Sequence, residues 1–187
     1  MLANHNRVSP GYLGLSAGIR IPVVSRWNAE VGLGFYQTQS LTLSGKVYQY
    51  NRLEFYNMNY NYKISNRRLM LEGKLLTEYA SLFHPYITAG IGINRNRSYA
   101  YQEIPFQNYA VPDPAFTSAT EPSLSYSLGL GVDVDIDKHW RLGVGYSYSS
   151  LGAAQLSTSP AQLTSQKITT GSIQGNQFML QVTYAMS

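Results

Sequence analysis

The chain has 187 residues, enough for one domain, of which 44% are hydrophobic and 13% are charged, about half the charge of an ordinary soluble domain. The net charge of +4 comes from dispersed basic residues, so no nucleic-acid partner is expected, and the absence of cysteine excludes disulfides and thiolate chemistry. No apolar run is longer than six residues, whereas a transmembrane helix needs about 20, so helical membrane spans are excluded.

Apolar residues alternate with polar ones through most of the chain, which predicts β-strands with one apolar face. We expect residues 1–10 to be an N-terminal segment and 11–187 to form one domain. In chain order, the alternation predicts eight strands at 12–21, 28–36, 55–64, 68–78, 86–94, 123–136, 140–149 and 177–186. Strands of about ten residues match the 9–11 tilted residues that cross a bilayer.

The connections between these strands differ in length. Short connections are predicted at 23–27, 65–67, 81–85 and 137–139, and long ones, rich in Pro, Ser, Thr and Gln, at 97–122 and 152–172. The intermediate segment 38–50 has room for another strand, for which 44–50 is the candidate. An even strand number would then imply that a first strand precedes Met1.

The composition of the two strand faces indicates the solvent that each one meets. One face carries Leu, Ile and Val in its middle and aromatic residues towards its ends, as lipid-facing walls do. The other is mostly Gly, Ser, Asn, Thr and Gln, unlike the charged wet face of a soluble sheet. We therefore expect an all-β, closed, antiparallel up-and-down transmembrane barrel of about eight strands with a lumen filled by side chains. A soluble ligand-binding β-barrel or sandwich is the alternative.

The polar face carries a small set of charged residues: Arg20, Glu30, Glu72, Lys74, Asp133 and Arg141. We expect them to point inward and most of them to pair with opposite charges in a structural network; the alternative is that they line a narrow solute path. Asp133, Asp135 and Asp137 imitate the start of a calcium-binding EF-hand loop, but Lys138 and Val144 stand where that loop needs Gly and Glu. No catalytic residue, metal site or cofactor is expected.

Three short segments carry a resemblance to a known family. The sequence His-Pro-Tyr-Ile-Thr-Ala-Gly-Ile-Gly at 84–92 resembles the turn and fifth strand of opacity-type bacterial outer-membrane β-barrel proteins. The segments 129–132 and 143–146 are similar to the sixth and seventh strands, and the similarity spans about residue 11 to the C-terminus. The resemblance implies a small, eight-stranded, porin-like barrel in the bacterial outer membrane, with long loops outside, both termini in the periplasm and no enzyme activity. The chain departs from the family in its last residues, Tyr-Ala-Met-Ser, and in the length of 38–50.

These observations predict a non-enzymatic barrel of the outer membrane that acts as a surface interaction or structural protein. A small porin-like channel or a hydrophobic-solute conduit is the alternative. If the long loops lie outside, the turns at 23–27 and 65–67 lie at the same end, and that outer rim collects Arg26, Arg67, Arg68, Arg95 and Arg97. Two interpretations stay open: the arginines are solvated turn residues with no shared partner, or at least three of them lie in one band and bridge phosphates of lipopolysaccharide, because a guanidinium binds phosphate through paired hydrogen bonds. The expected partners are thus outer-membrane lipid, lipopolysaccharide and a surface ligand of the loops.

Overall fold

The computed structural model describes residues 2–3, 11–48, 56–79, 82–106, 112, 116–157, 168–169 and 172–186. Within them every regular element is a β-strand, and all strand pairs are antiparallel. In this part of the chain no helix is long and apolar enough to cross a membrane.

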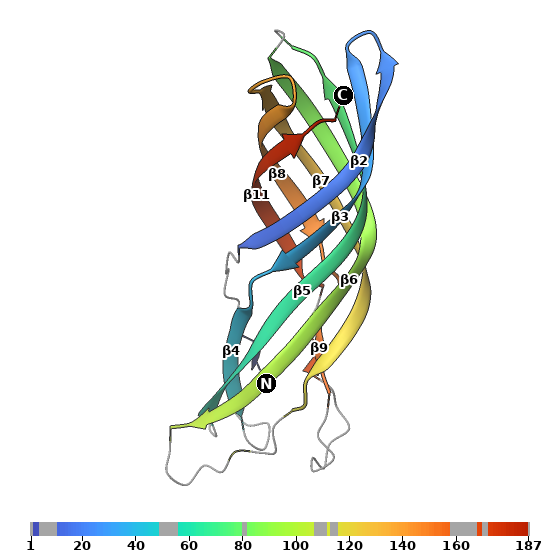
Figure 1. Ribbon diagram of the computed structural model, residues 1–187. Coiled ribbons are helices and arrows are strands. Elements are labelled where there is room, and N and C mark those ends of the chain that lie inside the picture. Colours follow the sequence, from blue (N-terminus) through green and yellow to red (C-terminus); the bar gives the residue numbers. More distant parts are fainter. Residues whose placement is uncertain are drawn as a thin grey trace.

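Nine strands form the main sheet, and two short strands form a second one (Figure 1). The main sheet consists of β1 (Leu2–Ala3), β2 (Tyr12–Val24), β3 (Trp27–Thr38), β4 (Leu41–Tyr48), β5 (Tyr56–Thr77), β6 (Phe83–Pro105), β7 (Ala119–Asp135), β8 (Trp140–Ser150) and β11 (Gln174–Tyr184). The second sheet pairs β9 (Gln155–Leu156) with β10 (Ile168–Thr169).

The main sheet is a meander in which each long strand pairs with the next one along the chain. The order β5-β6-β7-β8-β11 follows the sequence. β3 pairs with β2 on one side and with the second half of β5 on the other, and β4 pairs with the first half of β5. Two consecutive strands, β3 and β4, therefore fill the position of one long strand.

The two ends of the sheet differ. The connections β2–β3, β5–β6 and β7–β8 and the C-terminal end of β11 lie at one end, which we name the turn end. The connections that follow β4, β6 and β8 lie at the other, which we name the loop end. Figure 1 shows β5 and β6, with β4 beside them, continuing past β2, β8 and β11 towards the loop end, at the bottom of the view. Their 22 and 23 residues are about twice the number needed to cross a bilayer.

The sequence-based prediction of a turn at 65–67 is wrong, because β5 runs without interruption from Tyr56 to Thr77. Asn66 pairs with Asn96 of β6, and its side chain is buried. The polar run Ser-Asn-Arg-Arg is typical of a turn in isolation, but here its alternate residues face the sheet interior. The extra strand predicted at 44–50 corresponds to β4, and residues 49–50 lie outside the described part of the chain. β6 and β7 also take up much of the predicted 97–122 connection.

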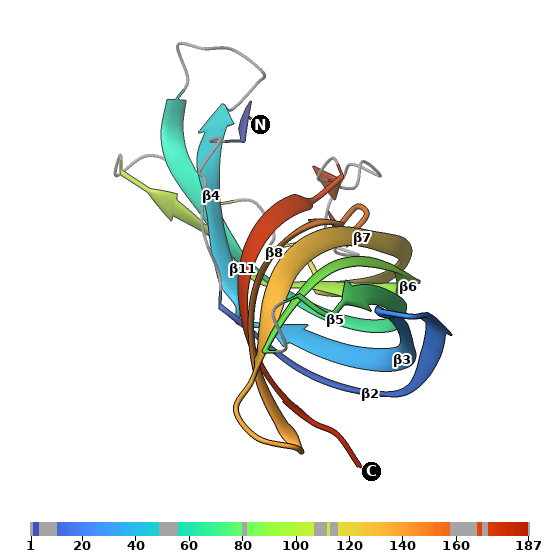
Figure 2. The ribbon, with the colours of Figure 1, turned by 90° about the horizontal axis from the view of Figure 1, so that it is seen from above.

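The sheet curls around a central axis but is not closed into a barrel in the described residues (Figure 2). No pairing joins the terminal strands β2 and β11 in this part of the chain. Both run from the loop end to the turn end, so they are parallel to each other. The expected closed barrel of about eight strands is thus replaced by a curled antiparallel sheet with a seam between β2 and β11, which one strand of opposite direction would close.

The two faces of the curled sheet have opposite chemistry. Leu128, Leu130 and Ile87 on the outer face each expose more than half of their surface. Ser125 and Ser149, on the inner face, are buried. Aromatic residues gather on the outer face at the turn end: Trp27, Phe83, Trp140 and Tyr184. An apolar outer wall with an aromatic border and a polar interior is typical of a sheet that faces lipid.

Candidate functional site

Charged side chains meet inside the curled sheet near the turn end. Arg20 of β2 pairs with Glu30 of β3 across the strands, and its Nε and Nη2 donate to Glu30 Oε1 at 2.9 and 2.5 Å. Nη1 of Arg141 lies 3.7 Å from the same oxygen. The structure therefore brings three of the six predicted network residues together, although Arg20 and Glu30 remain partly exposed.

Lys74 and Asp133 form a second, more deeply buried pair. Lys74 Nζ donates to Asp133 Oδ2, and Gln181 Nε2 donates to Oδ1 at 2.6 Å. Lys74 Nζ also lies 4.0 Å from the centroid of the Tyr86 ring. Because Asp133 is only 1% exposed, its carboxylate is stabilised by Lys74 and Gln181 rather than by water.

His84 and Asp135 belong to the same network, although they were not among the predicted residues. Arg141 Nε donates to Asp135 Oδ1 at 2.6 Å, and His84 Nε2 lies 2.8 Å from Oδ2. His84 falls in the connection predicted at 81–85, yet it belongs to β6 and is buried. The alternation of β6, extended two residues back from Tyr86, is the signal that places it inside.

Glu72, the last predicted network residue, interacts with groups nearer the loop end. Tyr36 donates to Glu72 Oε2 at 2.5 Å, and the Arg68 guanidinium carbon lies 4.8 Å from the Tyr36 ring centroid. Arg68 Nη2 donates to Gln177 Oε1 at 3.0 Å. Arg68 was predicted at the outer rim, and this position is wrong: its side chain is buried inside the curled sheet.

Three asparagines close the interior towards the loop end. Asn66 Nδ2 donates to Asn94 Oδ1 and, at 2.8 Å, to Asn96 Oδ1. Asn96 Nδ2 in turn donates to the carbonyl oxygens of Leu151 and Ala153, both at 2.9 Å. The residues that follow β8 are thereby held across the interior, and side chains fill its mouth.

Beyond the asparagines lies an apolar and aromatic cluster formed largely by the extended parts of β5 and β6. Its buried members are Met58, Tyr60, Tyr62, Ile64, Tyr101, Ala154 and Leu156. The Tyr60 ring lies 5.9 Å from that of Tyr101, which contacts Phe116 edge-on at 5.0 Å. This cluster gives the loop end a core of its own.

A comparison with protein-family models agrees with this architecture. Residues 5–185 match the family model described as outer membrane protein beta-barrel domain. The chain belongs to this family. Searches of the curated proteins and of the solved structures gave no significant match. The curled sheet is therefore that of an outer-membrane barrel protein, and its apolar outer face has the composition of a lipid-facing wall.

Three of the five predicted rim arginines gather on the outer wall of this outer-membrane barrel protein. Arg67 of β5 pairs with Arg95 of β6, and Arg97 lies two residues further along β6; all three are exposed. Arg26 lies in the β2–β3 turn at the opposite end, which contradicts its predicted place. The predicted rim depended on a turn at 65–67, and without it the remaining arginines lie along continuous strands.

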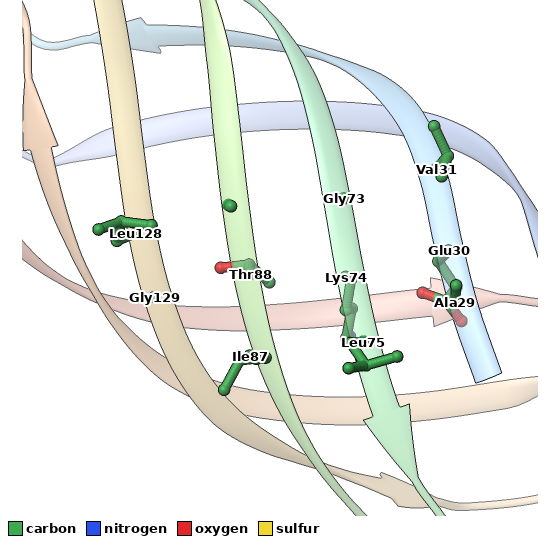
Figure 3. Close-up of a pocket in the computed structure, with 11 residues that line it drawn as sticks. Ala29, Glu30, Val31, Gly73, Lys74, Leu75, Ile87, Thr88, Leu128 and Gly129 are labelled. Atoms are coloured by element: carbon green, nitrogen blue, oxygen red, sulfur yellow. The ribbon is translucent and has the colours of Figure 1, made fainter. Parts of the chain in front are cut away.

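The outer wall also carries an apolar depression of about 400 Å³, whose lining residues come from β3, β5, β6 and β7 (Figure 3). A row of paired positions, Val31, Gly73, Ala89 and Leu128, crosses these strands. Gly73 and Ala89, in the middle of the row, have the smallest side chains, so the wall is hollowed there. The ladders on both sides of Gly73 are unbroken, which makes this a notch in the wall and not an opening.

No metal centre is evident in the part of the chain that the structure describes. No group of three or more His, Asp or Glu side chains gathers there as metal ligands. His84 contacts Asp135, and Asp135 also accepts a hydrogen bond from Arg141, so both residues belong to the ion-pair network.

Proposed function

We propose that this outer-membrane barrel protein is a non-enzymatic surface protein whose loop end is an extracellular interaction platform. The observation that carries the proposal is the extension of β5 and β6. After Ile93, where the continuous apolar outer face of β6 ends, the strand continues to Pro105. That extension has its own packed aromatic cluster, so it presents an ordered surface beyond the membrane.

The lumen contents favour this role over a channel. Ion pairs between non-adjacent strands cross the interior near the turn end, and the asparagine cluster holds Leu151 and Ala153 across the loop end. A solute path needs continuous water-filled space, whereas here ion pairs and amide hydrogen bonds occupy the interior. The resemblance to opacity-type barrels supports the same role and the same orientation, with the loop end outside.

Single cysteines test the orientation and the exposure of the platform, since the chain contains none of its own. Ser118→Cys places a thiol at an exposed position of the loop end, and Lys138→Cys places one in the exposed β7–β8 turn. A membrane-impermeant maleimide on intact cells should label the Ser118→Cys variant and should reach the Lys138→Cys variant only after the outer membrane is permeabilised. Labelling of the Lys138→Cys variant alone on intact cells would refute the proposed orientation.

Planar-bilayer recordings test the filled lumen. The wild-type protein should give no discrete conductance, and an Asn66→Ala/Asn96→Ala variant should conduct more than wild type, because it removes side chains from the mouth. Steady wild-type conductance that these substitutions leave unchanged would favour the channel alternative.

A further inference from the structure

Four cations form a basic patch on the outer wall of β5 and β6, namely Lys63, Arg67, Arg95 and Arg97. All four are exposed, and alternation puts them on the face that carries Leu69 and Ile93. Arg67 and Arg95 stand directly opposite each other, an arrangement that destabilises a strand pair unless an anion lies between the charges.

The protein does not supply that anion among its described residues. No salt bridge there involves any of the four cations. The neighbouring outward positions are also uncharged: Gln37 pairs with Arg67, Pro122 with Arg95 and Thr120 with Arg97. Arg97 stacks over Tyr99 at 5.3 Å, and the Tyr99 hydroxyl is 2.7 Å from Ser40 Oγ, so the aromatic side of the patch is held in place.

The position of the patch identifies the missing anion. On β6 the outer wall is apolar from Phe83 to Ile93, a span of the length that crosses a bilayer. Arg95 is the next outward residue, so the patch lies where hydrocarbon ends and lipid phosphates begin. A guanidinium binds phosphate through two parallel hydrogen bonds, which suits two arginines facing each other.

From this position we infer that the basic patch binds the phosphate groups of an outer-leaflet lipid, and that the notch at Gly73 receives an acyl chain of the same lipid. Both features lie on β5 and β6. Gly73 is six residues from Arg67, which corresponds to about 20 Å along the strand and about 15 Å of depth at a 40° tilt. That depth is about half of a 30 Å hydrocarbon layer, within reach of one chain. The inference uses the proposed orientation, with the loop end outside.

Lipid-dependent stability of the purified protein in a neutral maltoside detergent tests the headgroup site. The probes are lipid A with its phosphates, lipid A without them and inorganic phosphate at equal phosphate concentration. Phosphorylated lipid A should raise the midpoint of thermal unfolding, and the other two should raise it far less. Equal stabilisation by dephosphorylated lipid A, or by inorganic phosphate alone, would overturn the inference.

Two variants with the same charge change provide the comparison. Arg67→Gln/Arg95→Gln should weaken binding of phosphorylated lipid A by about 10- to 100-fold, whereas Arg26→Gln/Lys138→Gln, at the turn end, should leave it unchanged. Lys63→Gln/Arg97→Gln is the second test if the first variant folds poorly in detergent alone. Equal losses in the patch and turn-end variants would contradict a site at the patch.

Gly73→Leu tests the acyl-chain part without changing any charge. Its added side chain meets open space, since only Ala89 O lies within 4 Å of a Cβ built there, at 3.9 Å. The variant should fold normally and lose part of the stabilisation by lipid A, and an unchanged shift would contradict chain binding in the notch. Because these assays use detergent, their failure is distinguishable from a failure of the cysteine labelling on cells.

Discussion

At the scale of single residues, the interior of this protein is determined by which buried polar groups have partners. Asp133 has an ammonium and an amide at its two oxygens, whereas the hydroxyl of the buried Tyr86 has no hydrogen-bond partner among the described residues. Removal of a partner of Asp133 leaves a buried charge unpaired. Removal of the Tyr86 hydroxyl breaks no hydrogen bond.

Asp133→Asn should lower the free energy of unfolding by about 3–5 kcal/mol, because it leaves the Lys74 ammonium buried without its carboxylate. Lys74→Met/Asp133→Leu should cost less than Asp133→Asn, since no charge is left unpaired. Arg20→Gln, at a partly exposed pair, should cost about 1 kcal/mol or less. Urea unfolding in detergent measures all three, and a double variant less stable than Asp133→Asn would contradict the pairing.

The Tyr86 hydroxyl occupies the position where a side chain at residue 145 would lie, which accounts for the glycine there. A Cβ at Gly145 would lie 2.4 Å from Tyr86 Oη, while the next atom, Leu130 O, is at 3.1 Å. Gly145→Ala should therefore destabilise the protein by about 1–3 kcal/mol, and by less than half of that in a Tyr86→Phe background. A double-mutant cycle measures this coupling, and additive effects would show that the hydroxyl is not the obstacle.

At the scale of elements, the loop end is tied to the sheet by amide hydrogen bonds across β5, β6 and the residues after β8. Asn96 Nδ2 contacts two carbonyl oxygens of that segment. Asn96→Ala should release residues 151–157 and speed their cleavage by a protease at unchanged overall fold. Asn176→Ala, at an exposed position of β11, is the matched control; equal cleavage rates in the two variants would contradict the tether.

The β7–β8 turn is stabilised by Asp137, whose Oδ1 accepts hydrogen bonds from the backbone N–H groups of His139 and Trp140 at 2.7 and 2.8 Å. These two bonds lower the pKa of Asp137 below its ordinary value of 3.8. A depressed pKa adds stability that is present above pH 3.8 and is lost as the pH falls through the folded-state pKa. Asp137→Asn should remove this part of the acid dependence, measured as unfolding midpoints between about pH 2 and 6; an unchanged dependence would refute it.

Much of the sheet is predictable from the sequence, because alternation is a local pattern. It identifies the faces of β7 and β8 and places Asp133 and Arg141 inside. What it misses depends on contacts far apart in the chain. Residues 65–67 have the local composition of a turn. Their place in a strand depends on hydrogen bonds from Asn66 to Asn94 and Asn96, some 30 residues later, which the local pattern does not reveal. The wrongly predicted turn also led to the wrong position for Arg68 at the outer rim. Its partners Tyr36 and Gln177 lie on strands that are distant in the sequence.

At the scale of the whole molecule, the seam between β2 and β11 limits how the sheet can be completed in lipid. Hydrocarbon offers no hydrogen-bond partners, so unpaired strand edges are costly there. Two copies inserted in the same orientation have no antiparallel way to join these edges, because β2 and β11 run in the same direction in each. An antiparallel ladder across the seam requires a strand that runs from the turn end to the loop end.

The central claim, that the apolar face of the sheet meets lipid, is tested most directly by adjacent single cysteines on β7. Leu128 lies on the outer face and is exposed, whereas Ser127 lies on the inner face. In native outer membranes a lipid-phase thiol reagent should label the Leu128→Cys variant and leave the Ser127→Cys variant unlabelled. Labelling of the Ser127→Cys variant without labelling of the Leu128→Cys variant would contradict the claim.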